Sequence, residues 1–171
     1  MIEILPLTAC CDYQLEMLLD AAFGEDRKSR TAYMLRQGMT AIGDLSYGLI
    51  EAGILVGSIQ CWPIQITGDD GLTSDLILVG PVAIAPGRQN QGLGQMLMNA
   101  AIKAAELQPP HSQMPPMIMI GDPEYYGRFG FSAGDTAGWR LPGPFEQHRL
   151  LLRYGGSRAL PRTGMIGPRE S

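Results

Sequence analysis

The sequence predicts an α/β fold, in which helices alternate with the strands of a largely buried sheet. Residues 76–84 (LILVGPVAI) are apolar at nearly every position, as expected of a central strand that is covered on both faces. Directly after this strand, apolar residues recur at helical spacing from position 93 to position 105. A second apolar run, residues 117–120 (MIMI), follows that helix. This order of strand, helix and strand is typical of the α/β class.

The first part of the chain predicts one short strand and two helices. Residues 2–5 read as the strand. Residues 12–22 place leucines at helical spacing, and Asp12 is available as the N-cap. Residues 27–37 predict a second helix with a partly exposed surface. Two strands follow within residues 46–66, separated by a turn near residues 51–53.

The central strand contains a proline that a regular strand would not tolerate. Pro81 has no N–H to donate to a neighbouring strand, so proline is confined to edge strands and bulges. A run as apolar as residues 76–84 belongs in the middle of a sheet rather than at its edge. We therefore predict a bulge at Gly80 and Pro81, with a local break in the pairing to the neighbouring strand.

The helix that follows has one apolar face, and it begins near Gln91. Its predicted buried residues are Leu93, Met96, Leu97, Ala100, Ala101, Ala104 and Ala105. After the strand at 117–120, Asp122 and Pro123 predict the start of a short helix over residues 124–129. Gly130 is expected to end this helix in a left-handed conformation.

The last strands are expected within residues 138–153, and residues 156–171 are expected to form an irregular tail. The chain has 171 residues, so we expect a single domain over residues 1–155. Its 13 basic and 17 acidic side chains give a net charge of -4, which does not favour nucleic-acid binding. We also expect no membrane association, because no apolar run reaches the ~20 residues of a membrane helix.

The cysteines and the N-terminus predict a cytoplasmic protein. Cys10, Cys11 and Cys61 have no metal-binding spacing and are expected to be reduced thiols. The N-terminal sequence MIEILPLTACC has no basic region of the kind that begins a signal peptide.

The stretch RQNQGLG, residues 88–94, predicts an anion site at the start of the helix. The N-terminus of a helix offers unpaired N–H groups and the positive end of a dipole. Gly92 and Gly94 would let phosphate oxygens approach the backbone closely. On the turn alone, an ordinary connection in which glycine only relieves crowding explains the pattern equally well.

Two common phosphate-binding motifs do not match this stretch. A dinucleotide fingerprint needs a third glycine, but the sequence has Leu97 at that position. An ATPase-type loop needs a lysine after the last glycine, but Gly94 is followed by Gln95. A ligand that combines a pyrophosphate with an amide-bearing arm would satisfy both the anion site and the broken strand pairing. Coenzyme A has this composition.

Two segments resemble motifs of the GNAT N-acetyltransferase superfamily. The segment VAIAPGRQNQGLGQMLM resembles its coenzyme-binding motif Q/R-x-x-G-x-G/A, which falls on residues 89–94. The segment GDPEYYGRFGF, residues 121–131, resembles a later motif in which a tyrosine precedes Gly-Phe. Within the superfamily the chain looks most like bacterial enzymes of unassigned substrate with a GD-x-x-YY-x-RFGF signature. The resemblance implies a three-layer α/β (α+β) fold with a mixed, mostly antiparallel sheet, a splayed central strand pair and helices on both faces.

The resemblance also implies the ligand and the residues that bind it. Acetyl-CoA would be the co-substrate, and no metal would be required. The backbone of Val82, Ala83 and Ile84 would hold the pantetheine arm. The pyrophosphate would lie against Gln89, Asn90, Gln91, Gly92, Leu93, Gly94 and Gln95.

The tyrosine of the second motif is Tyr126, which would protonate the thiolate of coenzyme A as it leaves. A phenol with a pKa near 10 can donate a proton at neutral pH. Tyr125 is the alternative acid, since adjacent helical residues point about 100° apart and only one can face the thiol. A purely structural aromatic is the other interpretation of Tyr126.

One position departs from the family. Many members carry a glutamate in the central strand that deprotonates the amine, and Leu78 stands at that position here. Asp75 or Glu51 would have to act through a water, and the ordinary interpretation of both is a solvated strand-end acid. The general base is therefore unassigned, and a non-catalytic acyl-CoA-binding regulatory module is the alternative function. The acceptor is expected to be a small-molecule or peptide amine, and a homodimer is compatible with the family.

Overall fold

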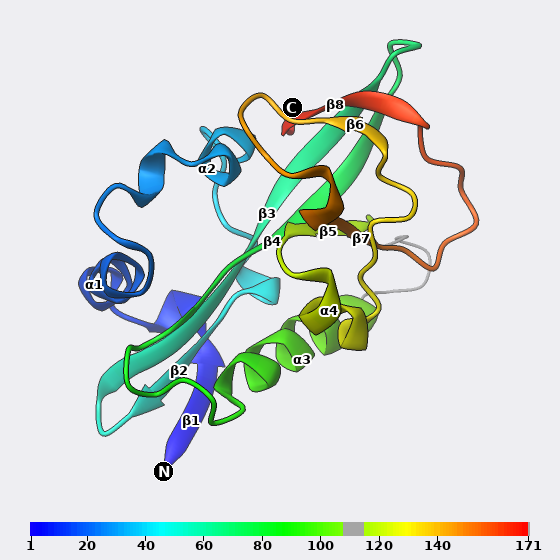
Figure 1. Cartoon of the computed structure of the whole chain (residues 1–171). Helices are drawn as coiled ribbons and strands as arrows, with labels where there is room; N and C mark the ends of the chain where they lie inside the picture. The colour runs from blue at the N-terminus through cyan, green and yellow to red at the C-terminus, as the bar shows by residue number, and fades with distance from the viewer. Residues whose placement is uncertain (108–114, 171) are drawn as a thin grey trace. The chain divides into compact units, whose positions relative to one another are not determined.

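The computed structural model describes residues 1–107 and 115–170, and eight strands in these residues form one sheet (Figure 1). The strands β1, β2, β3, β4, β5 and β7 are successive neighbours, while β8 pairs with β3 and β6. Their bounds are β1 Ile2–Pro6, β2 Tyr47–Glu51, β3 Ile54–Gly68, β4 Thr73–Ile84, β5 Met117–Ile120, β6 Gly138–Arg140, β7 Leu150–Arg153 and β8 Thr163–Pro168.

The sheet is mixed and mostly antiparallel, as the family resemblance implied. The pairs β1/β2, β2/β3, β3/β8 and β5/β7 are antiparallel, whereas β4/β5 and β6/β8 are parallel. The helices are α1 Asp12–Phe23, α2 Thr31–Leu35, α3 Leu93–Glu106 and α4 Pro123–Tyr126. Short 3-10 segments occupy Leu7–Ala9, Arg27–Ser29, Gly43–Leu45, Gly127–Phe129 and Gln147–Arg149. The predicted fold class is confirmed.

The described chain divides into two compact units, each with its own core. Unit 1 comprises residues 1–28, 41–61 and the described part of 80–112. Unit 2 comprises residues 29–40, 62–79 and the described part of 113–171. The long strands β3 and β4 contribute residues to both units, so the division does not follow a linker in the sequence. A single domain over residues 1–155 stays a prediction.

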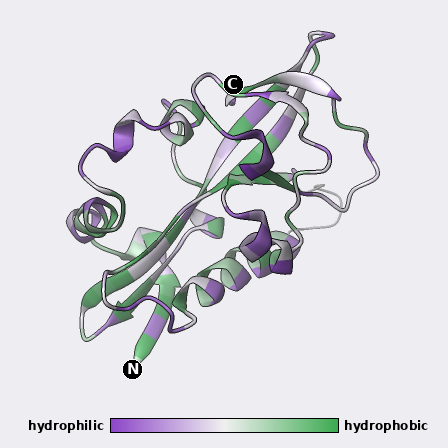
Figure 2. Ribbon diagram, in the orientation of Figure 1, coloured by the Kyte–Doolittle hydropathy of each residue, from purple (hydrophilic) through white to green (hydrophobic). Residues whose placement is uncertain are grey.

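In unit 1, α1 and α3 cover opposite faces of the strands (Figure 1). Two leucines of α1 pack with Leu55 of β3 and Ala83 of β4. On the other face, a Cβ added to Gly57 of β3 would lie 3.3 Å from the side chain of Leu97 in α3. The strands of this unit are largely hydrophobic, whereas the loop that precedes α3 is hydrophilic (Figure 2).

The buried face of α3 agrees with its predicted face only in part. Its buried residues are Leu93, Leu97, Met98, Ala101, Ile102 and Ala105. Met96 was predicted to be buried, but it is 40% exposed. Met98 and Ile102 were assigned to no face, and both are buried. The helix therefore presents a face that is rotated toward Met98.

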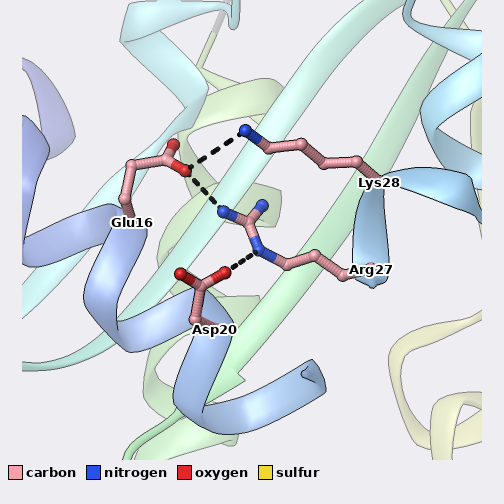
Figure 3. Close-up of polar contacts among 4 residues, drawn as sticks. All are labelled: Glu16, Asp20, Arg27 and Lys28. Atoms are coloured by element: carbon pink, nitrogen blue, oxygen red, sulfur yellow. Dashed lines mark hydrogen bonds and ion pairs between the residues drawn. The ribbon is translucent and has the colours of Figure 1, made fainter. Parts of the chain in front are cut away.

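A buried arginine fixes the chain just after α1. Arg27 is 2% exposed, and its Nε donates to Asp20 Oδ1 at 2.9 Å (Figure 3). Its Nη2 lies 2.5 Å from Glu16 Oε2, and Lys28 Nζ approaches the same carboxylate at 3.8 Å. Both acids come from α1, so the helix supplies the negative charge that a buried guanidinium requires.

Unit 2 contains the main correction to the predicted elements. Residues 156–171 were expected to be irregular, but Thr163–Pro168 form β8, which pairs with residues 64–68 of β3. Arg169 then donates from Nη2 to the carbonyl of Leu76 at 2.8 Å and from Nε to the carbonyl of Ile64 at 3.2 Å. The C-terminal segment is therefore part of the sheet. Its many Gly, Pro and Arg residues hid a short strand that is stabilised by non-local pairing.

Three helix boundaries also differ from the prediction. The N-cap of α1 is Cys11 rather than Asp12, and Asp12 is the first helical residue. The expected helix over residues 27–37 is reduced to a 3-10 turn and α2. The helix predicted from Gln91 begins at Leu93.

Candidate active site

The loop between β4 and α3 presents the start of α3 without a side-chain cap. Gly92 is the N-cap, in the left-handed conformation with φ 77°, and no side chain bonds to the helix at this end. The first helical hydrogen bond runs from the N–H of Met96 to the carbonyl of Gly92, at 3.1 Å. The N–H groups of Leu93, Gly94 and Gln95 therefore precede the helical bonds, as an anion site requires.

The conformation of this loop depends on three residues with positive φ. These are Gly87 at 86°, Asn90 at 63° and Gly92 at 77°. A Cβ on Gly87 or Gly92 would meet no atom within 4 Å, so each glycine is required by its φ rather than by crowding. This removes the interpretation in which Gly92 only relieves crowding, and it leaves open space above the loop.

An ion pair joins this loop to the end of β2. Arg88 Nη1 donates to Glu51 Oε1 at 2.5 Å, Nη2 donates to Oε2 at 3.2 Å, and Nε donates to Gln91 Oε1 at 3.1 Å. The hydrogen bond from Arg88 lowers the pKa of Glu51 below its usual range. Glu51 is thus a partner of the loop, which argues against the role of general base considered from the sequence. Sequence reasoning missed this pair because the two residues are 37 positions apart.

The direction of the backbone confirms the irregularity predicted at Gly80 and Pro81. In a regular strand, residues an even number apart direct their N–H groups to the same side. The N–H of Ile77 bonds to the carbonyl of Pro116 beside β5, whereas the N–H of Ala85 bonds to the carbonyl of Val56 in β3. The alternation therefore breaks between them. Gly80 has φ 131° and the Gly80-Pro81 peptide is cis.

This break leaves the end of β4 without a partner strand on one side. The register with β5 pairs Ile77 with Met117 and Leu78 with Ile118, and no later pairing occurs in the described residues. Because Ala85 faces β3, Ala83 does so too, and the backbone groups of Val82 and Ile84 point to the opposite side. Of the three residues assigned to pantetheine, Val82 and Ile84 therefore carry the available N–H and carbonyl groups.

In unit 2, the start of α4 holds Tyr126 against Gly121. Asp122 Oδ1 accepts a hydrogen bond from the N–H of Glu124 at 3.0 Å, so Asp122 is the N-cap, as predicted. A Cβ on Gly121 would lie 2.6 Å from Cε2 of the Tyr126 ring. Only glycine therefore permits this packing, which explains the first residue of the GD-x-x-YY signature.

The surroundings of Tyr126 favour the protonated phenol. Burial raises the pKa of Tyr126, as does the neighbouring Tyr125, while Arg149 opposes the shift. The ring of Tyr125 lies 4.8 Å from that of Tyr126 and has the Arg128 guanidinium 4.3 Å from its centroid. Arg128 thus lies over the ring face of Tyr125, and the choice of Tyr126 as the acid stays a prediction.

The remaining base candidate is also engaged. Asp75 lies 3.5 Å from Arg169, and Leu78, at the position of the usual family glutamate, is buried in the core of unit 2.

No group of three or more His, Cys, Asp or Glu side chains is arranged for a metal ion in the described residues. Within the same residues, no helix combines the length and the apolar character needed to cross a bilayer.

Comparison with known proteins establishes the family. The model of the acetyltransferase (GNAT) family matches residues 13–109, which is more than half of the 171 residues. The chain belongs to the GNAT acetyltransferase family. The match includes the loop before α3 but ends before the segment around Tyr126. The family model therefore does not cover the second motif, and the assignment of that motif in this GNAT protein depends on the residues of the segment alone.

Individual relatives agree with this assignment. The protein named "Uncharacterized N-acetyltransferase YhbS" of Escherichia coli K12 is 26% identical over 144 residues, 80% of either chain. The crystal structure of YhbS from Escherichia coli in complex with CoA has a TM-score of 0.67 at 19% identity, and covers 99% of this chain and 89% of its own. A GNAT acetyltransferase from Brucella melitensis in complex with acetyl-CoA has a TM-score of 0.60 at 22% identity, with coverage of 99% and 96%. Both structures share the fold of this GNAT protein.

Proposed function

We propose that the protein is an N-acetyltransferase that moves an acetyl group from acetyl-CoA to a primary amine. The observation that carries the proposal is the uncapped start of α3 beside the unpaired end of β4. One element offers three N–H groups to an anion, and the other offers strand-like backbone groups to an amide-bearing arm. Two GNAT structures with the same fold hold CoA and acetyl-CoA, which supports this ligand.

Each group of candidate residues has a physical role in this proposal. The pyrophosphate lies on the backbone of residues 89–95, where the helix dipole favours negative charge. The amides of the pantetheine arm pair with Val82 and Ile84 in place of a neighbouring strand, next to Ala83. Acetyl-CoA supplies the thioester that a neutral amine attacks directly. A backbone N–H of the central strand stabilises the charge that develops on the carbonyl oxygen.

Tyr126 acts as the general acid in this reaction. When the carbon–sulfur bond breaks, the sulfur takes the proton of the Tyr126 phenol. The proton that the amine nitrogen loses as the amide forms passes to solvent, from which the phenolate is reprotonated. A phenol of ordinary pKa, near 10, already carries its proton at neutral pH, and burial shifts the pKa of Tyr126 further in that direction.

Thiol release with a panel of amines tests the proposal. The purified protein is incubated with acetyl-CoA and 1,4-diaminobutane, glycylglycine amide or Nα-acetyl-lysine amide, and free thiol is followed with time. We expect amine-dependent release with at least one class of acceptor. Release that never exceeds the rate without amine, at saturating acetyl-CoA, contradicts N-acetyl transfer.

The second candidate is a non-catalytic acyl-CoA-binding regulatory module. It is favoured by the leucine at the usual glutamate position and by the engagement of Glu51 and Asp75 with arginines. Calorimetry distinguishes the two functions. Tight binding of acetyl-CoA, without thiol release on any amine of the panel, is the result expected for a module.

A further inference from the structure

Two buried side chains on β3 have polar atoms without a hydrogen-bond partner. Ser58 is 0% exposed and Gln60 is 7% exposed. Neither Ser58 Oγ nor Gln60 Oε1 makes a hydrogen bond in the described part of the chain. Burying a polar group without a partner is unfavourable, and nearly all such groups in folded proteins are paired. Trp62 Nε1, at the next alternate position of β3, also lacks a partner in the described residues. Three such atoms on one strand call for an explanation.

A serine and a glutamine of equal burial elsewhere in the described chain do have partners. Ser46 is 1% exposed; its Oγ donates to the carbonyl of Ile42 at 2.8 Å and accepts from the N–H of Cys61 at 3.1 Å. Gln65 is 7% exposed, and its Oε1 accepts from the N–H of Glu170 at 3.2 Å. Ser58 and Gln60 thus differ from a serine and a glutamine of equal burial only in lacking partners.

The unpartnered atoms share one face of β3. A Cβ on Gly57 would point toward Leu97 of α3. Ser58 and Gln60 are one and three residues further along β3, so their side chains point to the opposite face, which carries α1. The hydrogen bond from Ala85 to Val56 fixes the position of this face relative to β4. Counting two residues along each antiparallel strand places Ser58 beside Ala83. Ala83 packs with α1, as a residue on the same face must.

We propose that Ser58 Oγ and Gln60 Oε1 form the hydrogen-bonding site for the amine group of the acceptor. This inference rests on the proposed acetyl transfer, because it identifies the second substrate by its N–H groups. A carbonyl oxygen accepts hydrogen bonds but cannot donate them, so Gln60 Oε1 requires a donor. A carboxylate or phosphate has none to offer, whereas an amine offers two or three. Both oxygens are uncharged, so they orient the amine and take no proton from it.

The position next to Ala83 suits this role. Val82 and Ile84 direct their backbone groups to the unpaired side of β4, where the pantetheine arm is proposed to lie. Ser58 lies on β3 beside Ala83 of the same stretch of β4, on the face that α1 covers. An amine held there would approach the coenzyme-binding strand from a neighbouring strand of the same unit.

Two substitutions and two matched controls test the proposal. Ser58→Ala and Gln60→Met remove the unpartnered atoms and nearly keep the volume, and Ser46→Ala and Gln65→Met make the same changes where partners exist. For the free protein, we expect Tm to be unchanged or higher in the first pair and lower in the controls. A fall in Tm for Ser58→Ala and Gln60→Met as large as in the controls would mean that water already satisfies these atoms, and it would overturn the proposal.

Kinetics provide the second readout. With the most active amine of the panel, we expect the amine KM of Ser58→Ala and Gln60→Met to rise about tenfold or more, because each loses a hydrogen bond to substrate. The KM for acetyl-CoA should stay within about twofold of the wild type, as should both constants in Ser46→Ala and Gln65→Met. An unchanged amine KM in both variants overturns the proposal.

Direct binding separates this inference from the proposed function. If no amine supports thiol release, calorimetric titration of the CoA-loaded protein with 1,4-diaminobutane and glycylglycine amide replaces the kinetics. Binding to the wild type that is lost in Ser58→Ala and Gln60→Met supports the amine site even though the transfer reaction has failed. Equal binding to all variants, or no binding to the wild type, overturns the amine site.

Discussion

Arg88 and Glu51 form a two-point ion pair that joins the loop before α3 to the end of β2, with nitrogen–oxygen distances of 2.5 Å and 3.2 Å. Both partners are partly exposed, so the pair adds little to global stability. Its value is local, since it holds in place the loop on which a pyrophosphate would rest. We expect Glu51→Gln to raise the KM for acetyl-CoA by about three- to tenfold, because the loop must then be ordered by the ligand. The kcat should be nearly unchanged.

A second two-point pair provides the control for this prediction. Arg140 contacts Asp69 at 2.7 Å and 3.3 Å in unit 2, where both side chains are more exposed than those of Arg88 and Glu51. Asp69→Asn should leave the acetyl-CoA KM unchanged, and equal effects of the two substitutions would remove the special role of Glu51.

The pKa of Glu51 is lowered, so its carboxylate persists at neutral pH and the pair is lost only as pH falls through that lowered pKa. Acetyl-CoA affinity should therefore be insensitive to Glu51 ionisation above about pH 5.

Tyr126→Phe should lower turnover by about 10²-fold or more and change acetyl-CoA affinity little, because it removes a proton donor and keeps the ring. Steady-state thiol release and calorimetry measure the two quantities separately. Tyr125→Phe is the matched control, since it removes the neighbouring hydroxyl, and its turnover should stay close to that of the wild type. Reversed effects would assign the acid to Tyr125.

The pH dependence of turnover should report the raised pKa of Tyr126. The phenol is active when protonated, and burial keeps it protonated to a higher pH than a free tyrosine. We therefore expect the alkaline fall in kcat to lie above the usual value of about 10. An alkaline fall near pH 8 that persists in Tyr126→Phe would show that another group limits the reaction.

Gly121→Ala should displace the Tyr126 ring while leaving the tyrosine and its hydroxyl group in the sequence. The added Cβ would lie 2.6 Å from Cε2 and 2.8 Å from Cδ2 of the tyrosine ring, so the ring must move. Overpacking of this kind costs about 1–3 kcal/mol, and the displaced phenol should reduce kcat. Gly127→Ala is the control in the same segment, because a Cβ there meets no atom within 4 Å. If both alanine variants retain wild-type kcat, the position of the Tyr126 ring does not matter for turnover.

The sequence predicted the features of this protein that depend on neighbouring residues. The bulge at Pro81 followed from a missing N–H group, and the cap at Asp122 followed from its spacing to Pro123. The left-handed cap at Gly130, with φ 88°, is a local property of the backbone as well. Each of these could be read from a few consecutive positions.

What the sequence could not predict depends on residues that are distant along the chain. Met98 rather than Met96 is buried because tertiary packing decides which edge of an apolar face turns inward. The partnership of Arg88 with Glu51 joins two strand ends that no local pattern relates. The missing partners of Ser58 and Gln60 become visible only when the hydrogen bonds of buried polar groups are followed in the folded chain. β8 was missed for the same reason, since its pairing partner lies about a hundred residues earlier.

Arg169 should make the C-terminal strand contribute measurably to stability. Its guanidinium donates to the carbonyls of Ile64 and Leu76 and lies 3.5 Å from Asp75. Arg169→Met keeps much of the aliphatic stem but removes these donors. We expect it to lower the free energy of unfolding by about 1–3 kcal/mol, as for hydrogen bonds from a charged group. Urea denaturation measures this change. Arg158→Met, at an exposed position of the same segment, should shift the free energy of unfolding by no more than about 0.5 kcal/mol. A matching shift in the two variants would mean that the C-terminal residues do not anchor β8 to the sheet.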